Sequence, residues 1–433
     1  MKTMYVVLVA ACVMGAAGVA WTADTAEKAV DAAKAATVVE PATLPATPPK
    51  ELSEQVKKGL KWVAEQQQKD SGGWAQGEES ATMGSGMSAI KDKANVGDTC
   101  IAVLALLRSG STPGQGEYKD NISKGIDFVC SEVEKSDKDS LSVTSVNGTR
   151  IQMKLGNAVD TFLASLLLGE VRNKMPDDVS KKRVVAALDK VLDKIEKNQK
   201  ADGSFANAGW APALAQGIAA KGANVSVDNG ATMKDETLER LRSSSTSRLD
   251  VSGKVTAGSS DAGVALYAQS STVSALNETQ QRYAIQYNDA KQQLAAAEAA
   301  PAATAPAELQ KKRDQVAVLQ TKMEENGKVL DKANATVVEQ LKDDKFIAGF
   351  GSNGGEEFLS YLNLGESLVV KGGDEWKKWD EKITANLNQI QNNDGSWSGH
   401  HCITGRTFCT SAALMVMMID REPAAIGAQI KKR

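Results

Sequence analysis

Aromatic residues and histidine are scarce in this sequence. Phe, Trp and Tyr make up 5% of the 433 residues, and the two histidines, His400 and His401, are adjacent. A pocket that guides carbocations or sugars by ring stacking usually offers more aromatic faces than this composition supplies. A Ser–His–Asp triad would have to use one of these two histidines. The composition therefore weighs against a pocket that stacks aromatic rings on a carbocation or a sugar. It also leaves a single place in the sequence for a catalytic histidine.

An excess of charge of one sign is also absent. The sequence has 51 Lys and Arg against 54 Asp and Glu, a formal net charge of −3, and no basic cluster stands out. Because proteins that bind nucleic acid need basic surface to neutralise phosphates, nucleic acid is excluded as a partner. Cysteine is also rare, with 5 residues. A chain of this length can bury a large core and needs no disulfides to fold.

Long apolar runs are confined to the N-terminus, which reads MKTMYVVLVAACVMGAAGVAWTA. Lys2, followed by an apolar stretch that ends in small residues, predicts a secretory signal peptide over residues 1–23. Val9-Ala10-Ala11-Cys12 resembles a bacterial lipoprotein box, so lipid attachment at Cys12 is the alternative, but the apolar stretch before it is short. We therefore favour export as a soluble periplasmic or secreted protein. No later stretch reaches the roughly 18 apolar residues that span a bilayer.

Beyond the signal peptide, residues 24–50 are rich in Ala, Thr and Pro and predict a tether. A pattern then recurs at roughly 50 to 65 residues, which indicates stacked supersecondary units. A charged amphipathic helix ends in Gln and acidic or amide residues, a Gly-aromatic turn follows, and a second helix is almost uncharged. The clearest copies have their first helix and turn at Val56–Trp74, Val191–Phe205 and Ile383–Trp397, and a weaker copy starts near Gly125.

The turn between the two helices has the form Gln-x-x-Asp-Gly-Ser-aromatic, at residues 199–205 and 391–397. The Asp-Gly pair can end the first helix with a residue that tolerates positive φ. We expect the aromatic residue to wedge between neighbouring hairpins. Charged first helices would lie outside and apolar second helices inside, in a double-layered helical ring.

These turns and paired helices resemble the prenyltransferase and squalene-oxidase repeats of the terpenoid-cyclase/protein-prenyltransferase superfamily. The resemblance implies an all-α (α/α)6 toroid. Six hairpins fit if residues 261–272 form the fourth inner helix and residues 356–370 the fifth. Hairpins 1 to 4 then occupy residues 51–275, and hairpins 5 and 6 occupy residues 343–433.

A different pattern separates the fourth and fifth inner helices. Residues 276–342 are charged and rich in Ala and Gln, and apolar residues recur every seven positions at Leu309, Val316, Met323, Leu330 and Val337. This heptad seam predicts an antiparallel coiled-coil hairpin. The hairpin is interpreted either as an arm that binds a protein partner or as an outer helix lengthened by a neutral insertion.

The densest group of reactive side chains is residues 398–409. It contains His400, His401, Cys402 and Cys409, which are all borderline or soft metal ligands. Asp98-Thr99-Cys100 at the first inner helix resembles the Asp-x-Cys zinc-ligand pair of protein prenyltransferases. The resemblance implies a zinc site built from Asp98, Cys100, His400, His401 and Cys409. Structural disulfides are the competing interpretation. The cysteines at 100, 130, 402 and 409 allow two disulfides, and Cys100–Cys409 and Cys402–Cys409 are alternative candidate pairs.

Acidic residues also mark the start of the fifth inner helix. Glu356 and Glu357 suit the helix dipole there, and the functional alternative is that one of them is a general base or ligand clamp in the ring. Glu366, inside an apolar run, needs a partner if buried, and Arg406 is the candidate. The sequence has no Asp-x-Asp-Asp, GCGEQ, P-loop, GxSxG or HExxH motif.

We therefore expect an exported toroid that binds a ligand or partner at the mouth of its ring. The expected ligand-binding residues are Asp98, Glu356, Glu357 and Arg406, with the two histidines beside them. The alternative is a zinc-dependent enzyme of the prenyltransferase type, in which zinc held by Asp98, Cys100 and a histidine activates a thiol or water.

Overall fold

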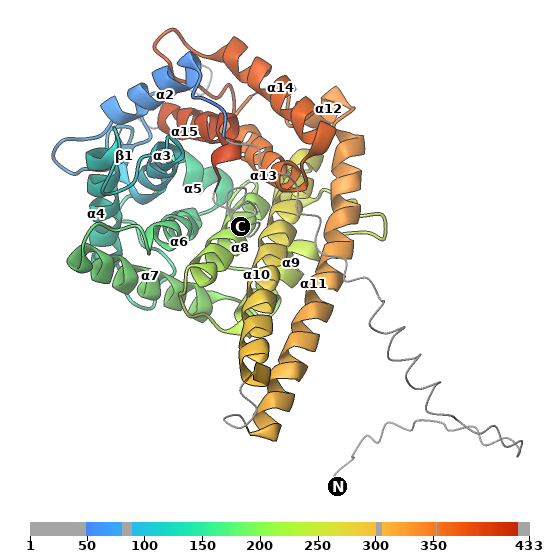
Figure 1. The fold of residues 1–433 in the computed structure, drawn as a ribbon. Coiled ribbons are helices and arrows are strands. Elements are labelled where there is room, and N and C mark those ends of the chain that lie inside the picture. The colour runs from blue at the N-terminus through green and yellow to red at the C-terminus, as the bar shows by residue number, and fades with distance from the viewer. Residues whose placement is uncertain (1–48, 80–88, 300–304, 352, 423–433) are drawn as a thin grey trace, which may run out of the picture. The chain divides into compact units, whose positions relative to one another are not determined.

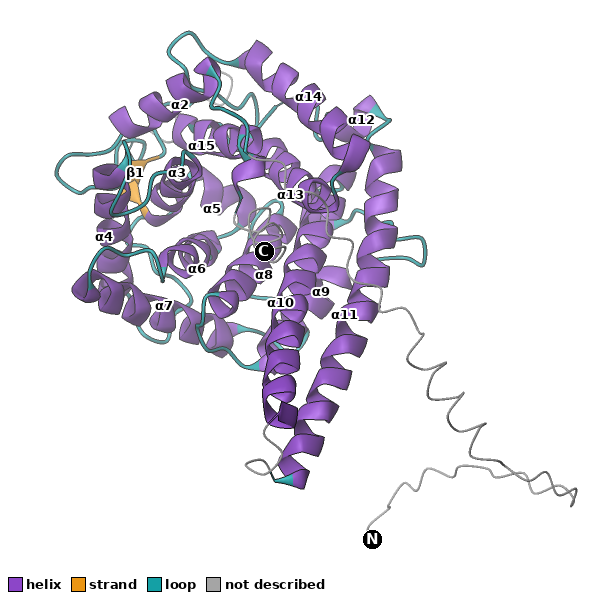
Figure 2. Ribbon diagram, viewed as in Figure 1, coloured by secondary structure: helices purple, strands orange, loops and turns teal. Residues whose placement is uncertain are grey.

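The computed structural model describes residues 49–79, 89–299, 305–351 and 353–422, and the regular secondary structure of these residues is almost entirely helical (Figures 1 and 2). The strands among them are β1 (Trp74–Ala75) and β2 (Ala94–Asn95), which pair antiparallel. The all-α prediction is therefore confirmed. The predicted signal peptide and nearly all of the predicted tether lie outside the described residues. Within the described part, no helix is both long and apolar enough to cross a membrane.

Six helices of the described part, here called the inner helices, contact one another in a closed order. Each contacts the next along the chain, and the last contacts the first (Figure 1). They are α3 (Val96–Arg108), α6 (Val159–Val171), α8 (Pro212–Asp228), α10 (Ala265–Ala299), α13 (Gly355–Lys371) and α15 (Arg406–Met417). All of α3 and α6 is buried, because these helices carry charge only near their two ends.

A second set of helices, the outer helices, is more polar and covers the first. They are α2 (Glu54–Glu65), α4 (Lys119–Lys135), α7 (Asp178–Asn198), α9 (Asp235–Thr246), α11 (Pro306–Gln340) and α14 (Gly373–Ile390). Each contacts the inner helix that precedes it in the closed order, so α2 contacts α15. Shorter segments are α5 (Arg150–Leu155), α12 (Asp344–Ile347) and the 3₁₀ turns η2 (Ser259–Asp261) and η3 (Ile419–Arg421).

The glutamine of each repeated turn links one hairpin to the next. Gln391 Nε2 donates to the carbonyl oxygen of Gly395 in its own turn and to that of Gln55 in α2, at 2.9 Å each. Gln67 makes the equivalent two bonds in the first hairpin, at 2.7 and 2.9 Å. Gly395 has φ +95°, which favours glycine, as the turn predicts. The repeated Gln and Gly residues are therefore structural.

The aromatic residue of the turn wedges between hairpins, as predicted. Trp397 is fully buried and donates from Nε1 to the carbonyl of Leu387 in α14, and its backbone N–H donates to Thr410 in α15. Its ring also abuts α2, where a Cβ at Gly59 would lie 2.8 Å from the ring. Trp74 makes the equivalent bonds in the first hairpin. The last hairpin is thus packed against the first.

The segment predicted as a coiled coil is continuous with the rest of the fold. The boundary expected at residues 275 and 276 falls inside α10, which serves as an inner helix and then extends along α11. The heptad residues of α11 are buried or half-buried, and burial increases towards Leu330 and Val337. The C-terminal part of α11 also binds α13, where Ser367 donates to Asn334 at 2.8 Å. These contacts fit a lengthened outer helix, and a partner for it stays a prediction.

Candidate functional site at the amino ends of the inner helices

Carboxyl groups gather where the inner helices begin. Asp98 lies in the first turn of α3, Asp160 in that of α6, and Glu356 and Glu357 in that of α13. Tyr267 occupies the first turn of α10, and His401 and Cys402 precede α15. We call these seven residues the amino-end cluster. The acidic side chains and Tyr267 are almost entirely inaccessible to solvent.

Glu357 is the best-bonded carboxylate of the amino-end cluster. It accepts from the backbone N–H groups of Phe350 and Gly354 at 3.0 Å each, and from the hydroxyl of Tyr267. His401 Nε2 lies 3.4 Å from Glu357 Oε2. Burial raises the pKa of Glu357, against the hydrogen bonds from Tyr267 and Phe350, which lower it. The side chain therefore joins α10, α13 and the loop before α15.

Glu356 is bonded through one oxygen only. Its Oε2 accepts from the backbone N–H of Ile403 at 3.0 Å, and its Oε1 has no hydrogen-bond partner among the described residues. Burial, with the neighbouring Glu357 second, raises the pKa of Glu356 to about 8. The Cys402 thiol also forms a side-chain hydrogen bond with the Glu356 carboxyl. A buried carboxylate oxygen without a partner costs about 1 to 3 kcal/mol.

Asp98 and Asp160 form a second pair, between α3 and α6. Asp160 accepts from the backbone N–H of Gly97 at 2.7 Å and from Gln152 Nε2 at 2.6 Å, and burial raises its pKa to about 6. Asp98 accepts from Asn95 Nδ2 at 2.8 Å, but its Oδ1 has no partner in the described structure. Burial raises the pKa of Asp98 to about 7, against the Asn95 hydrogen bond.

Aromatic rings form a partly exposed rim next to Glu357. Phe350 is 55% exposed and packs edge-to-face on Trp210, with ring centroids 5.1 Å apart, and lies 5.3 Å from the ring of His401. Trp210 in turn contacts Tyr267, whose hydroxyl donates to Glu357. Several of the few aromatic residues of the sequence are thus concentrated here. We call Trp210, Phe350 and His401 the aromatic rim.

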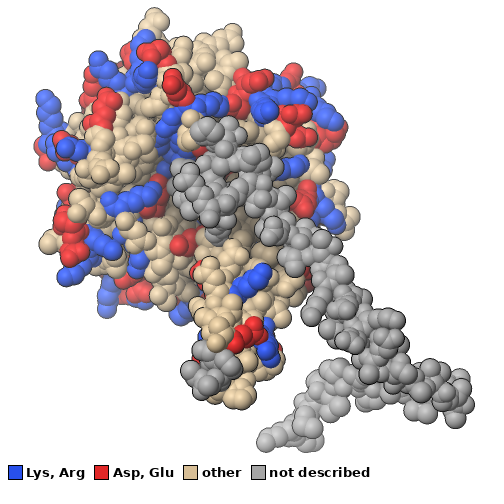
Figure 3. All heavy atoms as spheres, in the orientation of Figure 1, with Lys and Arg blue, Asp and Glu red and all other residues tan. Residues whose placement is uncertain are grey.

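Positive charge at the amino-end cluster is limited. Arg150 donates from Nε and Nη2 to the two carboxylate oxygens of Glu79, at 2.7 Å each, so its charge is already paired. Lys154 lies with its ammonium 5.2 Å from the centroid of Trp210, over the aromatic rim. The four carboxyl groups of the cluster therefore outnumber these nearby cations. On the face drawn in Figure 3, by contrast, acidic and basic side chains are intermingled.

The structure brings together most of the predicted ligand-binding residues. Asp98, Glu356, Glu357 and His401 join the amino-end cluster. Cys409 lies near enough to Asp98 and Glu356 for their charges to raise its pKa, although burial is the larger cause. The expected convergence at one end of the inner helices is therefore present for these side chains.

Arg406 and His400 are placed differently from the prediction. Arg406 was expected among the ligand-binding residues, but its side chain does not join the amino-end cluster. It donates to Asp394 and Ser396 near its own hairpin turn and stacks on Trp62. The partner of Glu366 is likewise Lys221 rather than Arg406.

His400 is exposed, whereas His401 is half-buried. The backbone N–H of His400 donates to the carbonyl oxygen of Asn353 at 2.8 Å. This bond ties the loop before α15 to the loop before α13. The two adjacent histidines therefore lie in different environments, and it is His401 that approaches Glu357.

The predicted metal site is not assembled. No group of three or more His, Cys, Asp and Glu side chains in the described part of the chain is arranged to hold a metal ion. The cysteines at 100, 130, 402 and 409 are buried free thiols, so neither proposed disulfide is formed. Burial raises the pKa of Cys402 to about 12, which leaves its thiol protonated and a poor nucleophile. Zinc chemistry therefore stays a prediction that the geometry does not support.

Several members of the site were not expected from the sequence. Asp160 had a usable signal, because Asp-Thr recurs at Asp98-Thr99 and Asp160-Thr161 in the first turns of consecutive inner helices. Tyr267 occupies an equivalent first turn in α10. Trp210 and Phe350 lie in irregular segments, where no periodicity marks them. Comparisons with protein-family models, curated proteins and solved structures give no match to this chain.

Proposed function

We propose that this protein is an exported (α/α)6 toroid that binds a small organic cation at the amino-end cluster. The observation that carries the proposal is the group of buried carboxyls, short of cations and with a partnerless Glu356 oxygen, next to a partly exposed aromatic rim. The closed order of contacts among the inner helices supports the toroid. Export rests on the N-terminal sequence alone.

The charge balance favours a positively charged ligand. Burial holds the pKa of Glu356 at about 8 and that of Asp98 at about 7, so protons occupy sites that a cation would otherwise neutralise. A cation bound nearby would favour the ionised carboxylates and displace those protons. Binding should therefore be coupled to proton release.

The aromatic rim favours an organic cation over a metal ion. Ammonium groups bind the faces of Trp and Phe rings, with a contribution of about 0.5 to 2 kcal/mol per contact. Lys154 already lies with an ammonium over Trp210, so the face of this ring suits such a group. The described carboxylates lack the grouping that a metal ion needs. A quaternary or primary ammonium compound fits both features.

Isothermal titration calorimetry with tetramethylammonium tests the proposal, and tert-butanol serves as the uncharged ligand of similar shape. Tetramethylammonium does not titrate, so any pH dependence belongs to the protein. We expect it to bind more tightly as the pH rises from about 6 to about 9, because Glu356 must lose its proton. Equal binding of tert-butanol, or no binding of the cation at any pH, would refute the proposal.

Two variants locate the site. Phe350→Ala should weaken cation binding by about threefold to tenfold, because one ring contact is lost. Val318→Ala on α11 is the matched control, since Val318 is also 55% exposed but lies far along another helix. Glu356→Gln should weaken binding and flatten its pH dependence. If both Phe350→Ala and Glu356→Gln bind as the wild type does, the cation site lies elsewhere.

A further inference from the structure

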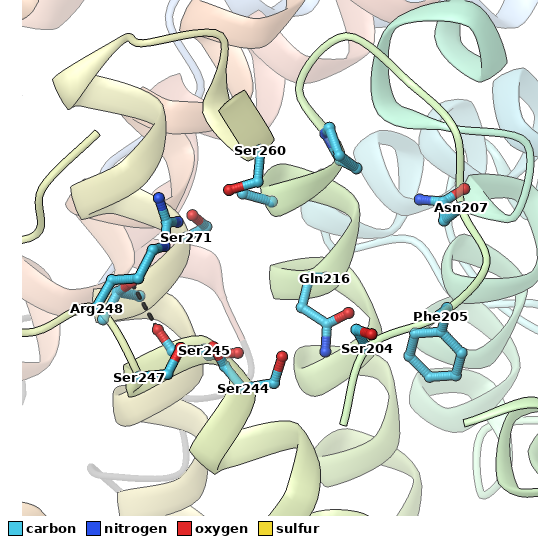
Figure 4. A pocket seen from close by; sticks show the side chains of 13 residues that line it. Ser204, Phe205, Asn207, Gln216, Ser244, Ser245, Ser247, Arg248, Ser260 and Ser271 are labelled. Carbon is cyan, nitrogen blue, oxygen red and sulfur yellow. Dashed lines mark hydrogen bonds between the residues drawn. The ribbon is translucent and has the colours of Figure 1, made fainter. Parts of the chain in front are cut away.

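A separate pocket lies between the third and fourth hairpins, and it is lined mainly by hydroxyl groups (Figure 4). Its volume is about 310 Å³. Serine side chains of α9 and the segment after it lie on one side, and Gln216 of α8 and Ser204 lie on the other. Ser271 and Thr272 of α10 complete the wall. None of these residues belongs to the amino-end cluster.

Most of these hydroxyls have already donated their hydrogen to the protein. Ser204 donates to Asp202 at 2.7 Å. Ser245, Ser271 and Thr272 donate to backbone carbonyl oxygens at 3.0, 2.6 and 2.8 Å. Ser247 does the same at 3.0 Å. A hydroxyl has one hydrogen and two lone pairs, so these groups can only accept from a ligand.

A smaller part of the wall is able to donate. Ser244 and Ser260 donate to no group among the described residues, so their hydroxyl hydrogens remain for a ligand. Gln216 uses one amide hydrogen on the carbonyl of Gly203, at 2.9 Å, and its side-chain oxygen is an acceptor in the pocket wall. Donors in the wall are therefore Ser244, Ser260, the second amide hydrogen of Gln216 and the Nε and Nη2 hydrogens of Arg248, because the two bonds of Arg248 leave from Nη1. The committed hydroxyls supply acceptors beside them. A suitable ligand must carry both donors and acceptors, as a sugar hydroxyl does.

The charged residue among those that line the pocket is already neutralised. Arg248 is paired with the buried carboxylate of Asp261 and also donates to the carbonyl of Thr256. A phosphate or sulfate offers few donors, so it would face the lone pairs of the committed serines while the arginine beside it is held by a carboxylate. A neutral ligand with hydroxyl groups meets no such conflict.

Apolar surface occurs on one side of the same pocket. The ring of Phe205 and the side chains of Pro212 and Ala213 line it. Sugars present C–H faces as well as hydroxyls, and small-ligand pockets start at about 300 Å³. From the hydroxyl pattern, the neutralised arginine and this apolar wall, we propose that the pocket binds a neutral saccharide of one or two rings. It does so by hydrogen bonding, with little ring stacking.

Titration calorimetry with neutral saccharides, including glucose, galactose, xylose, N-acetylglucosamine and trehalose, tests this inference. Inorganic phosphate and sulfate are titrated in parallel. We expect at least one saccharide to bind with one site per chain and neither anion to bind. Binding of an anion alone, or of no saccharide, would overturn the inference.

Ser244→Leu fills the pocket from α9 and removes a free donor, so it should weaken saccharide binding by about tenfold or more. Ser243→Leu is the matched control, because Ser243 precedes it on the same helix, is exposed and does not line the pocket. Equal affinity in the two variants would place the saccharide elsewhere. Phe350→Ala should leave saccharide binding unchanged, so failure of the cation proposal and failure of this one are distinguishable.

Discussion

The two ends of the inner helices carry similar buried acidic residues that are held by different partners. At the carboxyl ends, Arg108 lies between Glu170 and Glu422 and makes two hydrogen bonds to each, all of 2.7 to 2.9 Å. Lys221 pairs with Glu366 beside them. At the amino ends, the acidic side chains are bonded mainly to backbone N–H groups, amides and Tyr267. We call Arg108, Glu170, Lys221, Glu366 and Glu422 the carboxyl-end cluster.

Helix dipoles account for much of this difference. The amino end of a helix favours negative charge and offers free N–H groups, so carboxylates can be held there without cations. The carboxyl end disfavours them, and a buried carboxylate needs a cation. Burial alone would raise the pKa of Glu170, but Arg108 and Lys174 lower it to about 2. At the amino ends Lys154 only weakly opposes burial, and the pKa of Glu356 rises to about 8. Burial also outweighs the cation at one carboxylate of the carboxyl ends, because the pKa of Glu366 rises to about 8 beside Lys221.

Backbone strain also separates the two ends. The non-glycine residues with positive φ in the described structure are Ala262, at 54°, and Cys402, at 56°, and each lies shortly before an inner helix. Strained backbone and partnerless polar atoms tend to collect at functional sites. Partnerless carboxylate oxygens occur at both ends of the described helices, since Glu366 Oε2 lacks a partner as Glu356 Oε1 does. The strained backbone is therefore the feature that separates the ends and supports the binding proposed at the amino ends.

Removal of Arg108 should have the largest effect. Arg108→Met leaves Glu170 and Glu422 buried without their main cation, and we expect a loss of about 3 to 5 kcal/mol in the free energy of unfolding. Urea denaturation followed by circular dichroism measures it. Lys174→Met is the control, because Lys174 contacts the same Glu170 from a partly exposed position and should cost about 1 kcal/mol or less. Similar losses in both variants would contradict the contrast between the ends.

Glu356 should make the protein less stable in alkali. Its pKa is higher in the folded state than in the unfolded chain, so the folded protein holds more protons and its stability falls as the pH rises from about 5 to about 9. Glu356→Gln should remove on the order of 3 kcal/mol of that loss, while it keeps an acceptor for Ile403. Urea unfolding at several pH values measures the slope.

Glu375→Gln is the control for this pH effect, since Glu375 also lies in the first turn of a helix, α14, but is exposed. It should leave the slope unchanged. The effect of Glu170 on stability depends on pH in the opposite direction. Its pKa is lowered in the folded protein, so its contribution to the free energy of unfolding is lost as the pH falls towards about 2. A wild-type stability that is flat above pH about 5 would contradict the Glu356 assignment.

The repeated turns made much of the fold predictable. Gln391, Gly395 and Trp397 stand at fixed spacing because each makes a particular contact between hairpins, so their recurrence reports the hairpins directly. The continuity of α10 was not predictable, since a heptad pattern describes the seam between two helices and does not mark where an inner helix gives way to it. The boundary at residues 275 and 276 failed for that reason.

Sequence reasoning found the site residues that lie in conspicuous groups at or just before the first turns of inner helices, and His401 is one of them. Asp98, Glu356 and Glu357 converge because those turns share one end of the helix set. Arg406 also lies in a first turn, but its guanidinium forms an ion pair with Asp394 in the preceding turn. Sequence spacing alone does not show that Arg406 pairs there and does not point to the amino-end cluster. The serines of the hydroxyl-lined pocket come from separate segments, so only the folded chain groups them.

Lys154 provides a smaller test of the cation site. Its ammonium occupies the face of Trp210 and repels a second cation, so Lys154→Met should strengthen tetramethylammonium binding by about threefold to tenfold. Calorimetry at constant ionic strength measures the change. Lys291→Met is the matched control, since Lys291 lies over the ring of Tyr287 on the extended part of α10. Unchanged or weaker binding in Lys154→Met would contradict this repulsion and place the cation away from the face of Trp210.

The smallest expected effect concerns backbone strain at the amino ends. Ala262 adopts a left-handed conformation that glycine enters without steric cost, so Ala262→Gly should stabilise the protein by about 0.5 to 1 kcal/mol. Ala265→Gly, three residues later in the first turn of α10, should instead destabilise it by a similar amount, because that position is helical. Thermal unfolding of the two variants under identical conditions gives the comparison. Opposite shifts would establish that the chain holds strain where the inner helices begin, whereas two losses would mean that contacts of the Ala262 methyl group outweigh the strain.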